Sequence, residues 1–177
     1  AIVGVLSAGV LAGVIIGVAL SLVWLVYINA TPDVPVLGRI PGTQAFRSVE
    51  RYPDGLTVPD LLVVRFDAGL FFASAGALED RLRELVQRSD TPYDTVVISF
   101  EGVDFIDSQG SAKVRQVLEL ARTYGVQLRL ARVKPDVVDV LSRDGVIDEL
   151  GEENLFGNVQ QACADHIPSS PPPSQGR

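Results

Sequence analysis

Hydrophobic and polar positions divide this 177-residue chain into an uncharged apolar front and a longer part of mixed polarity. No charged residue occurs before Asp33, and only Ser7 and Ser21 interrupt the aliphatic, glycine and aromatic residues of the first 28 positions. As a helix this segment would be about 42 Å long, more than the roughly 30 Å of a bilayer's hydrocarbon core. The pattern predicts a transmembrane helix over residues 1–28.

The residues around the downstream end of this segment indicate its orientation. Trp24 and Tyr27 lie where aromatic side chains favour the membrane–water interface. Three arginines follow, Arg39, Arg47 and Arg51, and a positive bias favours the cytoplasmic side. We therefore expect residues 29–177 in the cytoplasm, attached to the cell membrane through residues 1–28. A cleaved signal peptide is the alternative, but it would need a basic start and a small-residue cleavage site.

Small residues recur every four positions along the apolar segment, at Gly9, Gly13, Gly17 and Ser21. A face of small residues lets a second helix approach closely within lipid, although glycine is also common in membrane helices generally. The chain contains no methionine, so we expect it to be part of a longer protein. Together these features favour the last helix of a multi-pass membrane protein.

Composition divides the remainder into three parts. Prolines and glycines concentrate in residues 29–43, which predicts a linker. Residues 168–177 are rich in proline and serine, which predicts a disordered tail. The folded domain is therefore expected over residues 44–167.

Three apolar runs predict strands at residues 61–66, 95–100 and 126–131. The first two are nearly continuous, as in strands covered on both faces. In the third, Gln127 and Arg129 alternate with apolar residues, which predicts one wetter face. A further strand is expected around residues 45–49, paired with the first run.

Helical periodicity lies between and after these runs. Apolar stripes, a cap at Asn158 and Pro135 in a first turn predict about four helices. Alternation of strand and helix implies right-handed crossovers. The predicted class is α/β, with a mostly parallel central sheet of four to five strands.

Charge and composition exclude several functions. The net charge of −7 argues against nucleic-acid binding, which needs clustered lysine and arginine. A basic group, Arg122, Arg129, Arg132 and Lys134, could face lipid headgroups or another domain, although its spread over two elements also fits a solvated surface. Cys163 and His166 are the single cysteine and histidine, too few ligands for a zinc site. No nucleotide-binding glycine motif and no paired nucleophile and base are present, so we expect neither a metal site nor an enzyme.

The segment from Glu101 to Gly110 carries the most information about function. It leaves the second strand and enters the helix that carries Val114 and Val117. In open parallel sheets, ligands and partners bind at the carboxyl ends of strands. A recognition surface is therefore expected at Asp104, Asp107, Ser108, Gln109 and Gly110. The alternative is that Asp107 and Ser108 only cap the helix.

These residues resemble a known family. Residues 104–110, Asp-Phe-Ile-Asp-Ser-Gln-Gly after an apolar strand, look like the signature loop of STAS domains. Residues 70–75, Leu-Phe-Phe-Ala-Ser-Ala, resemble a segment of the transporter branch, and residues 42–47 resemble the exit from its final membrane span. The combination resembles the C-terminal part of SulP-family sulfate and anion transporters.

This resemblance implies a cytoplasmic STAS domain, helices mostly on one side of its sheet, that regulates a membrane sulfate transporter and binds partners. Its first partner would be the transmembrane transport domain of the same polypeptide, with a regulatory protein or a guanine or adenine nucleotide as others. A nucleotide-sensing domain and a membrane-tethered anti-sigma-antagonist-like switch are the alternatives. The switch requires a phosphorylated serine where this chain has Gln109, so only Ser108 and Ser111 remain as phosphorylation candidates.

Overall fold

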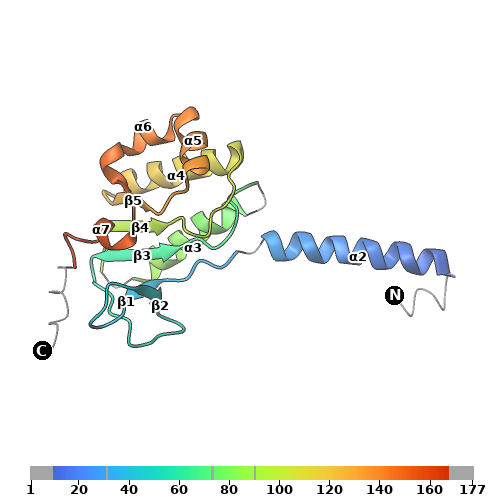
Figure 1. Ribbon diagram of the computed structural model, residues 1–177, viewed down its shortest axis with the longest axis horizontal. Coiled ribbons are helices and arrows are strands. Elements are labelled where there is room, and N and C mark those ends of the chain that lie inside the picture. Colours follow the sequence, from blue (N-terminus) through green and yellow to red (C-terminus); the bar gives the residue numbers. More distant parts are fainter. Residues whose placement is uncertain (1–9, 31, 73, 90, 168–177) are drawn as a thin grey trace, which may run out of the picture. The chain divides into compact units, whose positions relative to one another are not determined.

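The computed structural model describes residues 10–30, 32–72, 74–89 and 91–167 (Figure 1). Contacts within the chain divide it into two compact units, Ala1–Pro32 and Asp33–Arg177. The tail expected over residues 168–177 lies outside the described residues, as do residues 1–9 of the expected membrane segment.

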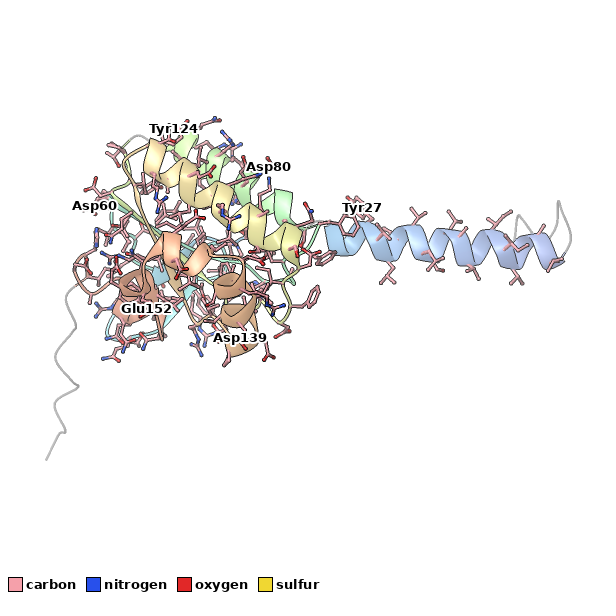
Figure 2. The ribbon with its side chains drawn as sticks, turned by 90° about the horizontal axis from the view of Figure 1, so that it is seen from above. Tyr27, Asp60, Asp80, Tyr124, Asp139 and Glu152 are labelled. Carbon is pink, nitrogen blue, oxygen red and sulfur yellow. The ribbon has the colours of Figure 1, made fainter. Side chains whose placement is uncertain are left out.

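The described part of the first unit is the helix α2 (Val10–Ala30). Most of its side chains are apolar, and those drawn project outward around the helix (Figure 2). The Ser21 hydroxyl donates to the carbonyl of Gly17 at 2.9 Å, and the rings of Trp24 and Tyr27 stack with centroids 6.0 Å apart. Within the residues that the structure describes, no helix is both long enough and apolar enough to cross a membrane. The span expected over residues 1–28 is therefore not confirmed.

Four parallel strands form the centre of the second unit. In spatial order they are β3 (Leu61–Arg65), β4 (Thr95–Ser99), β5 (Gln127–Ala131) and β6 (Leu155–Phe156). Leu61 pairs with Thr95 and Thr95 with Gln127, so the first three strands begin and end together. The three strands predicted from apolar runs are confirmed to within one residue at each end.

Helices connect the strands and cover one face of the sheet (Figure 1). They are α3 (Ala75–Arg88), α4 (Ser108–Thr123), α5 (Pro135–Arg143) and α6 (Val146–Leu150). Alternate strand residues, among them Leu62, Val96 and Leu128, form one core cluster with the apolar stripes of these helices. The α/β class with a parallel sheet is confirmed.

The opposite face of the sheet is covered by a short hairpin and by α7 (Val159–Ala162). The hairpin consists of β1 (Leu37–Arg39) and β2 (Phe46–Ser48), which pair antiparallel. The expected pairing of residues 45–49 with the first apolar run is wrong, because Val36 rather than β2 bridges to Val64. β1 falls in the segment expected as a linker, where a three-residue strand among prolines leaves no detectable period.

Three short elements near the C-terminus were also not predicted from the sequence pattern. The five-residue helix α6 follows α5 directly, and its Val146, Ile147 and Leu150 are buried in the main core. A 3₁₀ turn, η1 (Glu152–Asn154), then leads into the two-residue strand β6. Elements this short contain less than one clear repeat of their period, so a periodic pattern cannot reveal them.

Arg129 overturns the wetter face predicted for the third strand. The residue is 6% exposed and lies beneath α7. Its guanidinium donates to the carbonyl of Ala162 at 2.6 Å and to both carboxylate oxygens of Asp165, at 2.9 and 2.5 Å. It also lies 5.6 Å from the ring centroid of Phe156. A buried cation needs such partners, and here they join α7 to the sheet.

The hydrogen bonds from Arg129 lower the pKa of Asp165 to about 2, from an ordinary value of 3.8. A carboxyl group with a depressed folded-state pKa stabilises the fold above its ordinary pKa and loses that effect as pH falls towards 2. Asp165→Asn should therefore lower the free energy of unfolding at pH 7 by roughly 1 kcal/mol, a small effect because the Asp165 side chain is 57% exposed and screened by water.

The difference between the wild type and Asp165→Asn should shrink between about pH 4 and pH 2, measured by denaturant unfolding across pH. Asp139→Asn is the matched control, because Asp139 is an exposed carboxylate on α5 (Figure 2). An Asp165→Asn difference that stays constant over this pH range would contradict the assigned ion pair.

Candidate functional site

The two segments singled out in the sequence lie together at the carboxyl edge of the sheet. The backbone N–H of Leu70 donates to the carbonyl of Phe105 at 2.8 Å, and the N–H of Asp107 donates to the carbonyl of Leu70 at 3.2 Å. Leu70 also forms a parallel bridge with Ile106. The signature loop, residues 104–110, is therefore paired along its backbone with the segment that precedes α3.

Asp107 holds both segments through its carboxylate. One oxygen accepts from the backbone N–H of Gly110 at 2.8 Å and caps the N-terminus of α4. The other accepts from the N–H of Phe72 at 3.3 Å. The capping alternative is thus confirmed for Asp107, but the same side chain also fixes the position of the neighbouring segment.

Gly110 is required by the close approach of these two segments. A Cβ atom at this position would lie 2.1 Å from the carbonyl oxygen of Leu70 and 3.0 Å from a side-chain carbon of Ile106. Both neighbours are held by the main chain or the core, so neither can move freely. The glycine therefore allows the first turn of α4 to contact the Leu70 backbone.

Ser74 fixes the backbone of the other segment, which precedes α3. Its side chain is buried, and its hydroxyl donates to the carbonyl of Gly69 at 2.6 Å and accepts from the N–H of Phe71 at 3.1 Å. Sequence reasoning assigned no role to this serine, although it lies within the second motif. Its position immediately before α3 was the available signal.

Two aromatic and two uncharged polar side chains are exposed beside these fixed backbones. Phe72 is 77% exposed and Phe105 is 59% exposed. Ser108 and Gln109, at the start of α4, are exposed as well. Phe72 and Phe105 were not among the predicted site residues, because apolar residues in a motif are usually core residues. We call these four residues the loop surface.

The two serines considered for phosphorylation differ in accessibility. Ser108 is exposed, whereas Ser111 is fully buried in the first turn of α4. The Ser111 hydroxyl has no hydrogen-bond partner among the described residues. A kinase could reach Ser108 in this conformation but not Ser111.

Charged side chains around the loop are paired within the domain. Asp104 forms an ion pair with Lys134, and Glu101 lies 3.2 Å from Arg132. Arg122 donates to the backbone carbonyl of Glu149. With Arg129 buried, the basic group that could have faced lipid headgroups or another domain does not form one free surface.

Cys163 and His166 lie at the end of α7, away from the signature loop. Burial raises the pKa of the Cys163 thiol to about 12, so the thiol stays protonated at neutral pH. Among the described residues, no group of three or more histidine, cysteine, aspartate or glutamate side chains is arranged to hold a metal ion.

The fold and the loop define a small α/β domain in which a helix cap and a backbone pairing present a surface at the carboxyl edge of a parallel sheet. Residues 52–162 match the sequence model of the STAS domain. The chain belongs to the STAS domain family, and it is homologous to the C-terminal region of the SulP/SLC26 sulfate and anion transporters.

Two plant proteins illustrate the relationship at the level of sequence. The chain is 32% identical over 171 residues to "Probable sulfate transporter 4.2" of Arabidopsis thaliana, covering 90% of this chain and 25% of that protein. It is 28% identical over 175 residues to "High affinity sulfate transporter 2" of Stylosanthes hamata, covering 94% and 26%. The chain thus spans about a quarter of the length of the curated relatives it matches.

Solved structures show the same fold. The murine Slc26a9 anion transporter in the inward-facing state matches with a TM-score of 0.79 at 20% identity, over 93% of this chain and 27% of that one. A sulfate transporter family protein from Wolinella succinogenes matches with a TM-score of 0.55 at 20% identity, over 67% of this chain and 94% of that one. At these identities the likeness concerns the fold alone.

Replacing Gly110 with alanine should separate the two segments. The added Cβ must displace the Leu70 backbone, so we expect a loss of about 1–3 kcal/mol in the free energy of unfolding. Amide signals of residues 70–72 and 105–110 should shift in NMR spectra. Gly76→Ala is the matched control, because no atom lies within 4 Å of its added Cβ and alanine favours a helix. Equal stability of the two variants would contradict the assigned role of Gly110.

Proposed function

We propose that this chain is the cytoplasmic, non-enzymatic regulatory domain of a membrane transporter for sulfate or a related inorganic anion. The observation that carries the proposal is the loop surface, in which exposed Phe72 and Phe105 lie on backbones fixed by Asp107 and Gly110. The plant relatives are sulfate transporters about four times as long as the chain, which supports a transport domain as the partner.

The loop surface has the properties of a contact for another protein. Aromatic residues, phenylalanine included, are enriched in protein interfaces, and Ser108 and Gln109 offer hydrogen-bonding groups beside Phe72 and Phe105. Because Asp107 and Gly110 hold the backbone in place, little conformational entropy would be lost on binding. Of the signature-loop residues predicted from the sequence, Asp107 and Gly110 would therefore build the surface, and Ser108 and Gln109 would contact the partner.

The proposal includes a membrane location for residues 1–28. Its support is the sequence, since 28 successive uncharged residues are more than enough for one span when the residues before α2 are counted. Residues 29–177 would then lie on the cytoplasmic side. Phosphorylation of Ser108 and binding of a guanine or adenine nucleotide at the signature loop stay predictions.

Sulfate uptake tests the function directly. Cells deficient in sulfate transport would express the complete gene product that contains this chain, either intact or with residues 44–177 deleted. We expect labelled sulfate uptake by the intact protein and a changed rate after deletion, at equal amounts in the membrane. Unchanged uptake after deletion would contradict a regulatory role, and uptake of another inorganic anion alone would correct the substrate.

Alanine substitution of Phe72 and Phe105 tests the loop surface in the same assay. Truncating two interface anchors should weaken the partner contact by about tenfold or more, so uptake should move to the value of the deletion protein. Tyr124→Ala is the matched control, an exposed aromatic at the far end of α4 (Figure 2). If the double variant transports like the intact protein although the deletion does not, the loop surface is not the regulatory contact.

A further inference from the structure

A second feature lies at the carboxyl end of β3, apart from the loop surface. It is a cavity of about 290 Å³ between this strand end, the hairpin and the beginning of the second unit. Polar and charged residues make up most of its wall: Asp33, Arg47, Ser48, Glu50, Arg51, Tyr52, Arg65 and Asp67, together with Pro35.

Three acidic and three basic residues line this cavity, but they are not equally available. Arg65 is held by Asp67, with its Nε 2.6 and 2.8 Å from the two carboxylate oxygens. This pairing raises the pKa of Arg65 further, chiefly through the hydrogen bond. Glu50 lies 3.8 Å from Arg81, which is outside the cavity wall.

The remaining basic residues are Arg47 on β2 and Arg51 in the turn that follows it. Neither guanidinium has a hydrogen-bond or ion-pair partner among the residues that the structure describes. Besides the paired Asp67, the wall has two carboxylates, Asp33 and Glu50, and neither is paired with Arg47 or Arg51. Tyr52 adds a phenol group to the same wall.

Unpaired guanidinium groups beside hydroxyl donors favour one class of ligand. A guanidinium presents a planar set of N–H donors that matches the oxygens of a tetrahedral oxyanion. A cation is disfavoured, because both oxygens of Asp67 are engaged by Arg65 and no group of three potential metal ligands occurs among the described residues.

We propose that Arg47 and Arg51 form a binding site for a tetrahedral oxyanion, either a free sulfate or phosphate ion or the phosphate of a lipid headgroup. The free-ion form of this site does not depend on the proposed function. The lipid form gains support from the sequence, since only Thr31 and Pro32 separate α2 from Asp33. If residues 1–28 lie in a bilayer, Asp33 lies within about 17 Å of chain length from that segment.

The test for the free ion is calorimetric titration of the full chain in neutral detergent with sodium sulfate and sodium phosphate, at constant ionic strength. Binding should shift the amide NMR signals of residues 47–52 and 65–67. The double variant Arg47→Ala/Arg51→Ala should bind at least about tenfold more weakly. The control, Arg88→Ala/Arg143→Ala, removes the same net charge from exposed positions outside the cavity.

The lipid source is tested by reconstituting the full chain in nanodiscs of phosphatidylcholine, with and without phosphatidylglycerol. Shifts of the same amide signals only with phosphatidylglycerol, lost in Arg47→Ala/Arg51→Ala, would assign the site to a headgroup. Shifts with free ions alone would assign it to a soluble oxyanion. The proposal is overturned if neither probe moves these signals, or if the control variant weakens binding as much as the cavity variant.

These outcomes are separate from those of the uptake assay, because binding is measured on the chain without transport. A chain that binds the ion but does not alter uptake would sustain this site and contradict the regulatory function. A chain that regulates uptake without binding either probe would sustain the regulatory function and contradict this site.

Discussion

The contact between the first turn of α4 and the backbone of Leu70 determines how the carboxyl edge of the sheet is built. It exists because position 110 lacks a side chain, and it brings the carboxylate of Asp107 within reach of the N–H of Phe72. Two loops that follow different strands thereby become one backbone-paired unit. This pairing turns Leu70 and Ile106 inward, where they are buried in the core. The loop surface is exposed as a consequence.

The elements that cover the opposite face of the sheet are held in a different way. Its apolar cluster is small, and it is covered by a hairpin of three-residue strands and by the one-turn helix α7. Such short elements bury little apolar area, so packing alone holds them weakly. The guanidinium of Arg129 supplements it with directional hydrogen bonds to Ala162 and Asp165. A cation placed inside a sheet face would be costly by itself, and its partners on and after α7 make this position acceptable.

Sequence patterns predicted those helices and strands that are long enough to contain several repeats of the apolar pattern. The three long strands and the stripes of α3, α4 and α5 each contain several repeats, and each was placed correctly. β1, β6 and α6 are too short to show a repeating apolar pattern. Arg129 shows that a polar residue in an alternating strand can be buried when residues distant in the sequence supply its hydrogen-bond partners. The signature loop was found from its motif, but the exposure of Phe72 and Phe105 depends on contacts across 35 positions of sequence, which no local pattern contains.

The end of β3 lies next to both the cavity and the residue that leads into the signature loop. Gly102, which leads from β4 into the loop, packs so closely on the end of β3 that an added Cβ would lie 2.7 Å from the Cα of Asp67 and 2.8 Å from the carbonyl oxygen of Phe66. Asp67 is also the partner of Arg65 in the cavity wall. Asp67 therefore holds Arg65 with its carboxylate while its backbone lies against the residue that leads into the loop. Packed backbones at such distances cannot move independently, so the end of β3 and the start of the segment that leads into the signature loop are fixed relative to each other.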